Sequence, residues 1–454
     1  MLPEKFCQRM QALLGEEYEA FLSVMEEDSV RALRVNTDKI GTGDFCRLFP
    51  YPLTPLSYTK DGFIFDGDKV GNNPLHHAGA FYVQDPGAMA TLAALPIEKG
   101  WRVADLCASP GGKSTQISSC IGEEGFLLAN EYTPSRCRPL MENIERMGCR
   151  NVAVTSLDTR VLAEGYTAYF DLVLVDAPCS GEGMFRKYAY AQEEWSENEV
   201  LLCARRQRDI LENASSMVKD GGYLLYSTCT FSLEENEMTV DAFLSDHPEF
   251  FIMPVASALS TITDDGIAFA GAAFPKALPL ARRFYPHKAK GEGQFLCLMR
   301  KEITGAVSHA FFRDRLQDPS REELRLAQGL IESVMDMPKG YSLKKVADTA
   351  ILVKDGIVLP DKSLCMAGVA VGMYKKGRIE PLHRFFSAFG NDFHRKINLS
   401  LGDERLAKYL HGDTFPFDLS DGYAAVLVEG CALGGVKVVN GIAKNHYPKG
   451  LRLP

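Results

Sequence analysis

The chain contains no uninterrupted apolar run long enough to span a bilayer and no close Cys-x-x-Cys pair, although it has 12 cysteines among 454 residues. The first absence excludes a membrane-spanning helix, and the second argues against a zinc ribbon or a disulfide framework. The opening MLPEKFCQRM lacks the basic-then-apolar order of a signal peptide. We therefore expect a cytoplasmic globular protein with no membrane partner and no metal site, whose cysteines are reduced and mostly buried.

The sequence also lacks an excess of positive charge, since 50 Lys and Arg residues stand against 59 Asp and Glu residues, for a net charge of −9. This balance neither supports nor excludes a nucleic-acid partner, because a basic groove can lie on an acidic protein. No internal repeat or low-complexity segment is present, and a chain of this length is expected to form roughly two to four domains.

Short apolar runs alternate with helical stretches between about residue 80 and residue 300, a pattern typical of a parallel sheet covered by helices. The runs are WRVADLC, GFLLANE, NVAVTS, FDLVLVDAPC and GGYLLYSTC, and GQFLCLMRK adds a final strand. The sequence therefore predicts an α/β, doubly wound core in which ligands bind beyond the carboxyl ends of the strands.

The segments on either side of this core predict smaller units. Two short helices and the strand-like LRVNT indicate an α+β unit at the start, and SREELRLAQGLIESVM indicates a helix in a second one. The last segment alternates short strands with Gly turns, as a small barrel does. We expect four units, which cover residues 1–78, 79–302, 303–385 and 386–454.

The stretch DLCASPGGKSTQ, residues 105–116, places a Pro-Gly-Gly turn between a strand and a helix that opens near Lys113. Its spacing matches neither the dinucleotide fingerprint nor the P-loop. Glu131 follows the turn by roughly 20 positions, where such folds hold a ribose, and Asp158 ends the next run, where a carboxylate can accept from an adenine amine. Together these features describe an adenosyl pocket. Singly, Glu131 is equally a solvated strand end and Asp158 a helix N-cap.

Two cysteines follow neighbouring runs. VLVDAPCSGEGMFRK puts Asp176 and Cys179 at the end of the fourth run, and YSTCTFS puts Cys229 at the end of the fifth. A single buried cysteine is usually a structural one. Two thiols and a carboxylate that overhang one cleft beside a methyl-donor pocket indicate covalent catalysis instead.

Methylation of cytosine at carbon 5 is the chemistry that needs this set of groups. Addition of a thiolate to carbon 6 pushes electron density onto carbon 5, which then attacks a methyl sulfonium. An acid must hydrogen-bond ring nitrogen 3, a role that fits Asp176 if burial raises its pKa. A base must then remove the carbon 5 proton, and Cys179 is placed to help in that step.

At these residues the sequence resembles the Sun family of RNA cytosine-5 methyltransferases, and within it the bacterial RsmF (YebU) group that modifies 16S ribosomal RNA. The matching stretches, in order, are YVQDPGAMA, DLCASPGGKSTQ, DAPCSGEGMFRK, YSTCTFSLEENE and RRFYPHKAKGEGQFLCLMRK. The presence of both a Pro-Cys and a Thr-Cys pair separates RNA from DNA enzymes, so a DNA methyltransferase is the weaker enzyme hypothesis.

The resemblance implies a Rossmann-like core that uses S-adenosylmethionine, with Cys229 as the nucleophile and Cys179 assisting product release. It also implies that Glu131 binds the donor ribose, that Asp158 lies by the adenine, and that Asp176 contacts the donor or the base. The loop over the donor is then formed by Cys107, Ala108, Ser109, Pro110, Gly111, Gly112 and Lys113.

The resemblance further implies an RNA-binding N-terminal unit, a PUA-like C-terminal barrel and a monomer. Arg186 and Lys187 are the RNA contacts expected nearest the chemistry, and Lys444, His446 and Lys449 are expected to contact phosphates from the barrel. The alternative for the last three is a solvated turn. The alternative for the whole chain is a ribosome-assembly protein that binds RNA without turnover, against which the intact Cys229, Cys179 and Gly turn weigh.

Overall fold

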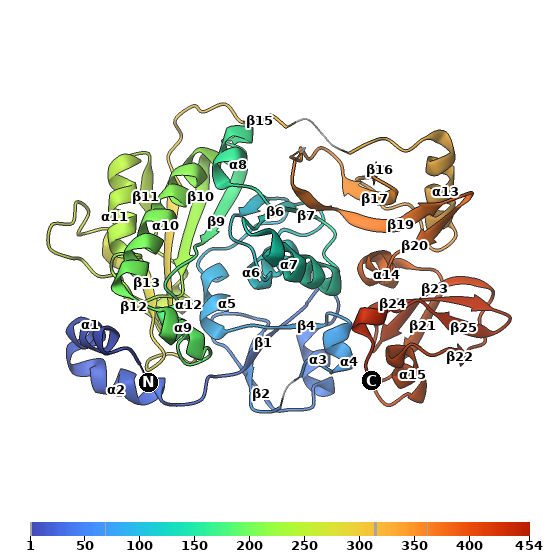
Figure 1. The fold of residues 1–454 in the computed structure, drawn as a ribbon, viewed down its shortest axis with the longest axis horizontal. Helices are drawn as coiled ribbons and strands as arrows, with labels where there is room; N and C mark the ends of the chain where they lie inside the picture. The colour runs from blue at the N-terminus through green and yellow to red at the C-terminus, as the bar shows by residue number, and fades with distance from the viewer. Residues whose placement is uncertain (1, 69, 313–315, 361) are drawn as a thin grey trace.

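The computed structural model describes residues 2–68, 70–312, 316–360 and 362–454. Figure 1 shows an elongated molecule in which the central sheet and its helices occupy one half, with the C-terminal segments side by side in the other. The N-terminal segments run beneath the central sheet, so the first and last parts of the chain approach each other near α4 and α15.

The N-terminal unit is a helical pair followed by a four-stranded antiparallel sheet of order β2-β3-β1-β4. Its elements are α1 (Glu4–Leu14), α2 (Tyr18–Met25), β1 (Ala32–Val35), α3 (Thr42–Leu48), β2 (Leu53–Pro55), β3 (Gly62–Phe65), α4 (Pro74–His77) and β4 (Phe81–Val83). Because β4 completes this sheet, the expected boundary at residue 78 falls inside the unit.

The central sheet has ten strands in the order β12-β13-β14-β10-β9-β5-β6-β7-β18, with β11 paired to β14. Its strands are β5 (Arg102–Asp105), β6 (Phe126–Asn130), β7 (Val152–Thr155), β9 (Phe170–Asp176), β10 (Val218–Thr228), β11 (Phe250–Ile252), β12 (Asp264–Asp265), β13 (Arg282–Phe284), β14 (Gln294–Lys301) and β18 (Leu364–Ala367). The five strands from β7 to β10 are parallel. They are buried on both faces, which explains their continuous apolar runs.

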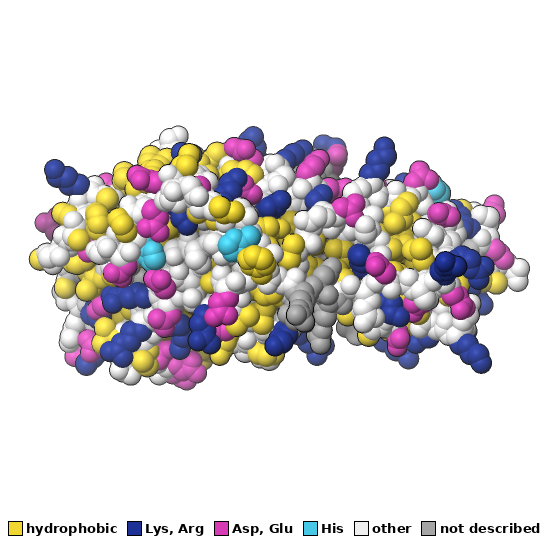
Figure 2. Space-filling view, turned by 90° about the horizontal axis from the view of Figure 1, so that it is seen from above, with side chains coloured by type: hydrophobic (Ala, Val, Ile, Leu, Met, Phe, Trp, Pro, Cys, Tyr) yellow, Lys and Arg dark blue, Asp and Glu magenta, His cyan; other side chains and the backbone are white. Residues whose placement is uncertain are grey.

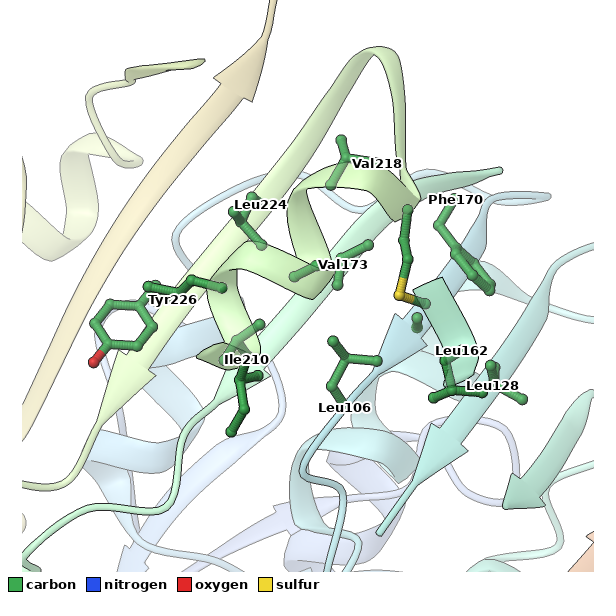
Figure 3. Close-up of a cluster of buried hydrophobic side chains, with 14 of the residues drawn as sticks. Leu106, Leu128, Leu162, Phe170, Val173, Ile210, Val218, Leu224 and Tyr226 are labelled. Atoms are coloured by element: carbon green, nitrogen blue, oxygen red, sulfur yellow. The ribbon is translucent and has the colours of Figure 1, made fainter. Parts of the chain in front are cut away.

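Helices cover both faces of this sheet. They are α5 (Pro86–Leu92), α6 (Gly112–Ile121), α7 (Pro134–Met147), α8 (Thr159–Gly165), α9 (Ala189–Glu194), α10 (Glu197–Met217), α11 (Glu237–Asp246) and α12 (Ser257–Ser260). Leu162 of α8 and Ile210 of α10 pack with Leu128, Val173 and Leu224 on one face, as Figure 3 shows. Helices α5, α6 and α7 pack on the other face. This arrangement confirms the predicted α/β core.

The parallel strands all present their carboxyl ends at one edge. Asp176 at the end of β9 lies in register with Ser227 near the end of β10. Four segments therefore leave the sheet side by side: the turn after β5, the residue after β6 and the two segments that carry the cysteines. Strands β9 and β10 are neighbours, which is the condition for the two cysteines to share one cleft.

The third unit contains the four-stranded sheet β16-β17-β19-β20 and is tied to the central sheet. Its elements are β15 (His309–Ala310), α13 (Arg321–Glu332), β16 (Tyr341–Val346), β17 (Thr349–Lys354), β19 (Val369–Lys375), β20 (Arg378–Pro381) and α14 (His383–Phe389). Strand β18, from the same stretch of chain, pairs with β7, and β15 pairs with β8 (Tyr166–Thr167). This unit therefore extends the central sheet by one strand.

The C-terminal unit is a curled five-stranded sheet of order β21-β23-β24-β25-β22 with one helix. Its elements are β21 (Lys396–Leu399), α15 (Glu404–His411), β22 (Phe415–Pro416), β23 (Gly422–Val428), β24 (Cys431–Val439) and β25 (Ile442–Asn445). Its apolar residues merge with those of the N-terminal sheet in one buried cluster. Among the described residues, none of the helices combines the length and apolar character that crossing a membrane requires.

Candidate active site

A single cavity of about 1340 Å³ lies beyond the carboxyl ends of the parallel strands. It is lined by the turn after β5, by Glu131 and Asp158, by both strand-end cysteines and by residues of the N-terminal unit. A volume of this size accepts two ligands of nucleotide dimensions rather than one. The residues that the sequence assigned to a donor pocket and to covalent chemistry therefore share one cavity.

The turn after β5 brings backbone close to the cavity. Gly111 has φ 110°, a left-handed conformation that favours glycine, and α6 begins at the next residue. Ser109 Oγ donates to the carbonyl of Arg136 at 2.9 Å, while an Arg136 guanidinium nitrogen donates to the carbonyl of Ser109 at 3.2 Å. The loop is thereby fixed to α7, and Gly112 and Lys113 at the start of α6 line the cavity.

The two acidic residues of the expected adenosyl pocket both line the cavity. Glu131 is buried, with Oε1 accepting from the Thr133 backbone N–H at 2.9 Å and Oε2 lying 3.6 Å from Arg136. Asp158 is the N-cap of α8, and its Oδ1 accepts from the Arg160 N–H at 2.9 Å. The capping role that the sequence offered as the alternative is present, and Asp158 also lines the cavity.

Asp105, at the end of β5, was missed by the sequence analysis. It is 1% exposed and borders the cavity, and Ser114 Oγ donates to its Oδ2 at 2.6 Å. Its Oδ1 has no hydrogen-bond partner within the part of the chain that the structure describes. Burial raises the pKa of Asp105 to about 7. A buried acceptor without a partner at the cavity wall fits a ligand that carries an amino group.

Cys179 and Cys229 face each other with their Sγ atoms 3.2 Å apart, and both line the cavity. The hydrogen bond to Cys229, and then burial, hold the pKa of the Cys179 thiol well above its usual range. The two sulfur atoms share one hydrogen bond, in which either thiol can be the donor. The geometry therefore brings the two predicted reactive thiols together at one place in the cavity.

Glu235 holds the turn that carries Cys179. It is fully buried, and its carboxylate accepts from the Ser180 N–H and from the Gln207 side-chain amide, each at 2.9 Å. The same amide of Gln207 donates to the Pro178 carbonyl at 3.0 Å. Burial raises the pKa of Glu235 to about 7. The sequence analysis missed both residues, although YSTCTFSLEENE places an acid a few positions after Cys229.

Glu182 holds the segment that carries Cys229. Its Oε2 accepts from the Phe231 N–H at 3.0 Å and from Thr230 Oγ1 at 2.9 Å. The Gly183 N–H donates to the carbonyl of Cys229 itself at 2.9 Å. A Cβ on Gly183 would lie 2.6 Å from the Gly293 carbonyl, so only glycine fits there. Both thiols thus stand on backbone fixed by buried carboxylates.

Asp176 accepts from two side chains at the cavity floor. Lys113 Nζ lies 2.7 Å from its Oδ2, and Ser227 Oγ donates to its Oδ1 at 2.6 Å. Its side chain is 30% exposed, so the burial on which the expected acid role depended is partial. Lys113, which follows the glycine turn after β5, is therefore ion-paired with Asp176 at the cavity floor.

Arg186 does not face the cavity, which corrects its expected role as an RNA contact. Its side chain is 2% exposed and pairs with Glu292 at 2.9 Å, while its other nitrogens donate to the carbonyls of Val24 and Gly291. A guanidinium engaged on every side in the protein interior acts as structural support. Lys187 does line the cavity, and its Nζ lies 2.7 Å from Asp85.

The C-terminal cations lie together on the curled sheet. Lys444 on β25 is directly opposite Lys437 on β24, and both are exposed, as is Lys449. His446 is half-buried, its N–H donates to the Gly435 carbonyl at 3.1 Å, and burial lowers its pKa. Two like charges directly opposite on a sheet repel each other. An anionic ligand would relieve that repulsion.

Within the described residues, no group of three or more His, Cys, Asp or Glu side chains is arranged to hold a metal ion. The 12 cysteines are free thiols. The chemical groups that line the cavity include carboxylates, amines and two adjacent thiols.

The sheet order, the donor loop and the cavity define a methyltransferase with a Rossmann-like core. A methyltransferase homologue from Pyrococcus horikoshii superposes with a TM-score of 0.58 at 27% identity, covering 66% of this chain and 95% of that one. NSun6 from the same organism, solved with SFG, gives a TM-score of 0.57 at 22% identity and covers 66% and 98%, which supports the fold alone.

Family models and relatives define the group more closely. The model for 16S rRNA methyltransferase RsmB/F matches residues 92–300, that for the N-terminal domain of RsmF matches residues 2–86, and that for the RsmF PUA domain matches residues 396–453. The ribosomal RNA small subunit methyltransferase F of Vibrio campbellii is 30% identical over 99% of this chain and 97% of its own length. This chain belongs to the RsmF family of 16S ribosomal RNA methyltransferases.

Two further relatives differ in the share of their length that this chain matches. The methyltransferase F of Erwinia tasmaniensis is 36% identical over 66% of this chain, which spans 63% of that relative. The one of Vibrio vulnificus is 28% identical over 99% of this chain and 97% of its own length. The resemblance stated from the motifs is confirmed at the level of the family.

Proposed function

We propose that this protein transfers a methyl group from S-adenosylmethionine to carbon 5 of a cytidine in 16S ribosomal RNA through a covalent bond between Cys229 and carbon 6. The observation that carries the proposal is the pair of thiols, 3.2 Å apart in the same cavity as the donor loop. The relatives named ribosomal RNA small subunit methyltransferase F support the substrate.

The donor end of the cavity suits an adenosyl ligand that carries an amino acid. S-adenosylmethionine supplies a methyl group activated by its sulfonium charge. In this proposal Glu131 accepts from the ribose hydroxyls and Asp158 from the adenine amine. Residues 107–113 close over the ligand, and Asp105 offers its unpartnered Oδ1 to an ammonium group. The exposed ring of Tyr132, next to Glu131, also lines this end.

The reaction begins when Cys229 adds to carbon 6 as a thiolate. Carbon 5 gains the electron pair and forms a bond to the methyl carbon, whose bond to sulfur breaks. A base then removes the carbon 5 proton, the ring double bond re-forms and the carbon–sulfur bond to Cys229 breaks. The enzyme thiolate is regenerated, so the steps balance.

Cys179 is the proposed base for the release step. Before reaction it is a thiol hydrogen-bonded to Cys229, and burial and that contact hold its pKa high. Once Cys229 is bound to carbon 6, this hydrogen bond is lost, and Cys179 can release its proton to water in the cavity. The thiolate then takes the proton from carbon 5. Glu235 and Gln207 keep Cys179 in place by holding its turn.

Asp176 and Lys113 are the proposed pair at the base ring. The contact of Asp176 with Lys113 brings both an acceptor and a proton donor to the end of β9. When the cytosine enters the cavity, either Asp176 or Lys113 must exchange its contact with the other for a contact with the base. In this proposal Asp176 contacts ring nitrogen 3 and the exocyclic amine, and Lys113 shields its charge.

The N-terminal unit and the C-terminal sheet are the proposed RNA-binding units. Ser29, Val30 and Arg31 of the N-terminal unit line the cavity, so RNA in the cavity contacts that unit. Lys444 and Lys449 supply exposed cations on the curled sheet. The target base reaches the thiols only when it is turned out of any helix, at a cost of roughly a few kcal/mol.

The test uses Cys179→Ala and Cys229→Ala variants, each incubated with S-adenosylmethionine and unmethylated 16S ribosomal RNA. We expect Cys179→Ala to accumulate a covalent protein–RNA band on a denaturing gel, because the release step lacks its base. We expect Cys229→Ala to form no band and no 5-methylcytidine, because addition to carbon 6 is lost.

Cys297→Ala is the control, since that thiol is buried in β14 away from the cavity. A band trapped by Cys229→Ala would reverse the two roles. A wild-type protein that binds the donor and RNA but methylates neither ribosomal RNA nor DNA would favour a non-catalytic assembly protein, and methylation of DNA alone would favour a DNA enzyme.

A further inference from the structure

Two exposed tyrosines stand at the same cavity as the cysteines and have no part in the chemistry proposed above. Tyr188 is 44% exposed and Tyr190 is 57% exposed, and both line the cavity. Their ring centroids are 5.3 Å apart, with 31° between the ring planes. Isolated apolar side chains on a surface need no explanation, but two adjacent rings left open to solvent at a substrate cavity do.

The tyrosines are tied to the nucleophile through a short run of backbone. The Gly183 N–H donates to the Cys229 carbonyl at 2.9 Å, and the Tyr188 N–H donates to the Met184 carbonyl at 3.1 Å. The Ala191 N–H in turn donates to the Tyr188 carbonyl at 3.1 Å, at the start of α9. The positions of the two rings are therefore set relative to Cys229, although the rings themselves face solvent.

Two cations that line the same cavity as the tyrosines suit a polyanion. Arg206, exposed on α10, and Lys187 line the same cavity. Tyrosine rings stack on nucleobases, and nearby cations contact the phosphates between them. Single-stranded RNA offers both a flat ring and a negative backbone, whereas a folded protein partner would leave the cavity beneath the rings unused.

We propose that Tyr188 and Tyr190 form a stacking site for an unpaired nucleobase next to the target cytidine, with Arg206 contacting the adjoining phosphate. This inference rests on the proposed function and adds a substrate-binding site to it. A neighbouring base held on the rings would keep the RNA unstacked while the target cytidine lies on Cys229. The site therefore selects RNA that is single-stranded, or opened, around the methylated position.

The experiment compares the double variant Tyr188→Ala/Tyr190→Ala with Tyr188→Phe/Tyr190→Phe, which keeps both rings and loses only the hydroxyl groups. Binding of fluorescently labelled 16S ribosomal RNA is measured without turnover, and methylation is measured as KM and kcat. Phe251→Ala is the matched control, because Phe251 is 40% exposed on β11 and does not line the cavity.

We expect the alanine pair to raise the RNA Kd and KM by about 5- to 100-fold, the range of lost base–aromatic stacking, while the affinity for S-adenosylmethionine is unchanged. The phenylalanine pair and Phe251→Ala should stay within about twofold of wild type. Since no charge is removed, the dependence of the Kd on salt concentration should keep its slope in the alanine pair.

An RNA Kd and KM within twofold of wild type in the alanine pair would overturn the proposal. So would an equal loss in the phenylalanine pair, because the rings would then not be the cause, or an equal loss in Phe251→Ala. A wild-type protein that binds RNA but transfers no methyl group would contradict the proposed function, and the binding comparison would still decide on the stacking site.

Discussion

At the scale of single residues, the site is built on two thiols, Cys179 and Cys229, whose Sγ atoms lie 3.2 Å apart. Cys179 contacts Cys229, and this contact and burial raise the pKa of the Cys179 thiol, while the segment of Cys229 is held through its own carbonyl by Gly183. The buried carboxylates of Glu182 and Glu235 touch neither thiol directly and fix the two turns instead. The two carboxylates that fix the turns are thus distinct from the thiols that the turns carry.

Glu131→Gln should weaken binding of S-adenosylmethionine by roughly 10- to 100-fold, because the neutral amide loses a hydrogen bond to a charged acceptor inside the protein. Isothermal titration calorimetry measures the Kd directly and needs no RNA. Glu142→Gln on α7 is the control, since that carboxylate is 59% exposed and pairs only with Arg138 on its own helix. An unchanged Kd in Glu131→Gln would remove Glu131 from the donor site.

At the scale of elements, the stretch from Gly181 to Glu194 connects three parts of the molecule. Arg186 at its centre reaches Val24 at the end of α2 and both Gly291 and Glu292 before β14. Phe185 packs in a buried cluster with Phe6 and Trp195. The N-terminal helices are therefore bound to the segment that carries the two exposed tyrosines.

Arg186→Ala should lower the free energy of unfolding by about 3–5 kcal/mol, because Glu292 would be left as an unpaired charge in the interior. Urea denaturation followed by circular dichroism measures this change. Lys5→Ala is the matched control: that lysine pairs with Glu197 in solvent, with side chains 68% and 43% exposed, and its loss should cost under about 1 kcal/mol. Equal stability of Arg186→Ala and wild type, with weaker RNA binding, would restore Arg186 as an RNA contact.

At the scale of the whole molecule, the N-terminal and C-terminal parts share one buried surface. Lys39 donates to the carbonyls of Ala78, Arg146 and Ala432, which lie in three different units. His77 Nδ1 lies 2.8 Å from the Tyr447 hydroxyl, and the His383 ring packs edge-on against Tyr447. Figure 2 shows acidic and basic side chains interspersed over the exposed face, so the acidic net charge is not gathered at one end of that face. Hydrogen bonds and ring contacts at this junction therefore hold the N-terminal, central and C-terminal units together.

The histidines of this junction should make the protein less stable in acid. Burial lowers the pKa of His383 to about 4 and that of His76 to about 3, whereas the unfolded chain keeps values near 6.5. Between these values the unfolded chain binds more protons than the folded one, so the free energy of unfolding falls as pH falls. At pH 5 the loss from His383 alone is about 2 kcal/mol.

Urea denaturation at pH 7.5 and pH 5.0 measures this loss, and His383→Leu should reduce the difference between the two pH values by about that amount. His411→Gln is the control, because that side chain is 59% exposed. If His383→Leu kept the full difference between pH 7.5 and pH 5.0, the acid sensitivity would come from another part of the molecule.

The sequence by itself determined the core fold and the family. Apolar runs of strand length, each followed by a polar or thiol residue, predict strands buried on both faces with a site at their carboxyl ends, because local pattern and burial are coupled. The motifs around Lys113, Cys179 and Cys229 need no long-range information, since each is one short continuous stretch of the chain.

Only the tertiary structure decided which charged residues are exposed or line the cavity, and so can contact a ligand. Arg186 looked like an RNA contact and is buried against Glu292. Glu235 is held by Ser180 and Gln207, and Asp105 and the Tyr188–Tyr190 pair line a cavity that distant segments form together. It also placed β4 with the N-terminal sheet and β18 with the central one. The physical reason is that burial, ion pairing and strand order depend on residues far apart in the chain, which a local pattern does not contain.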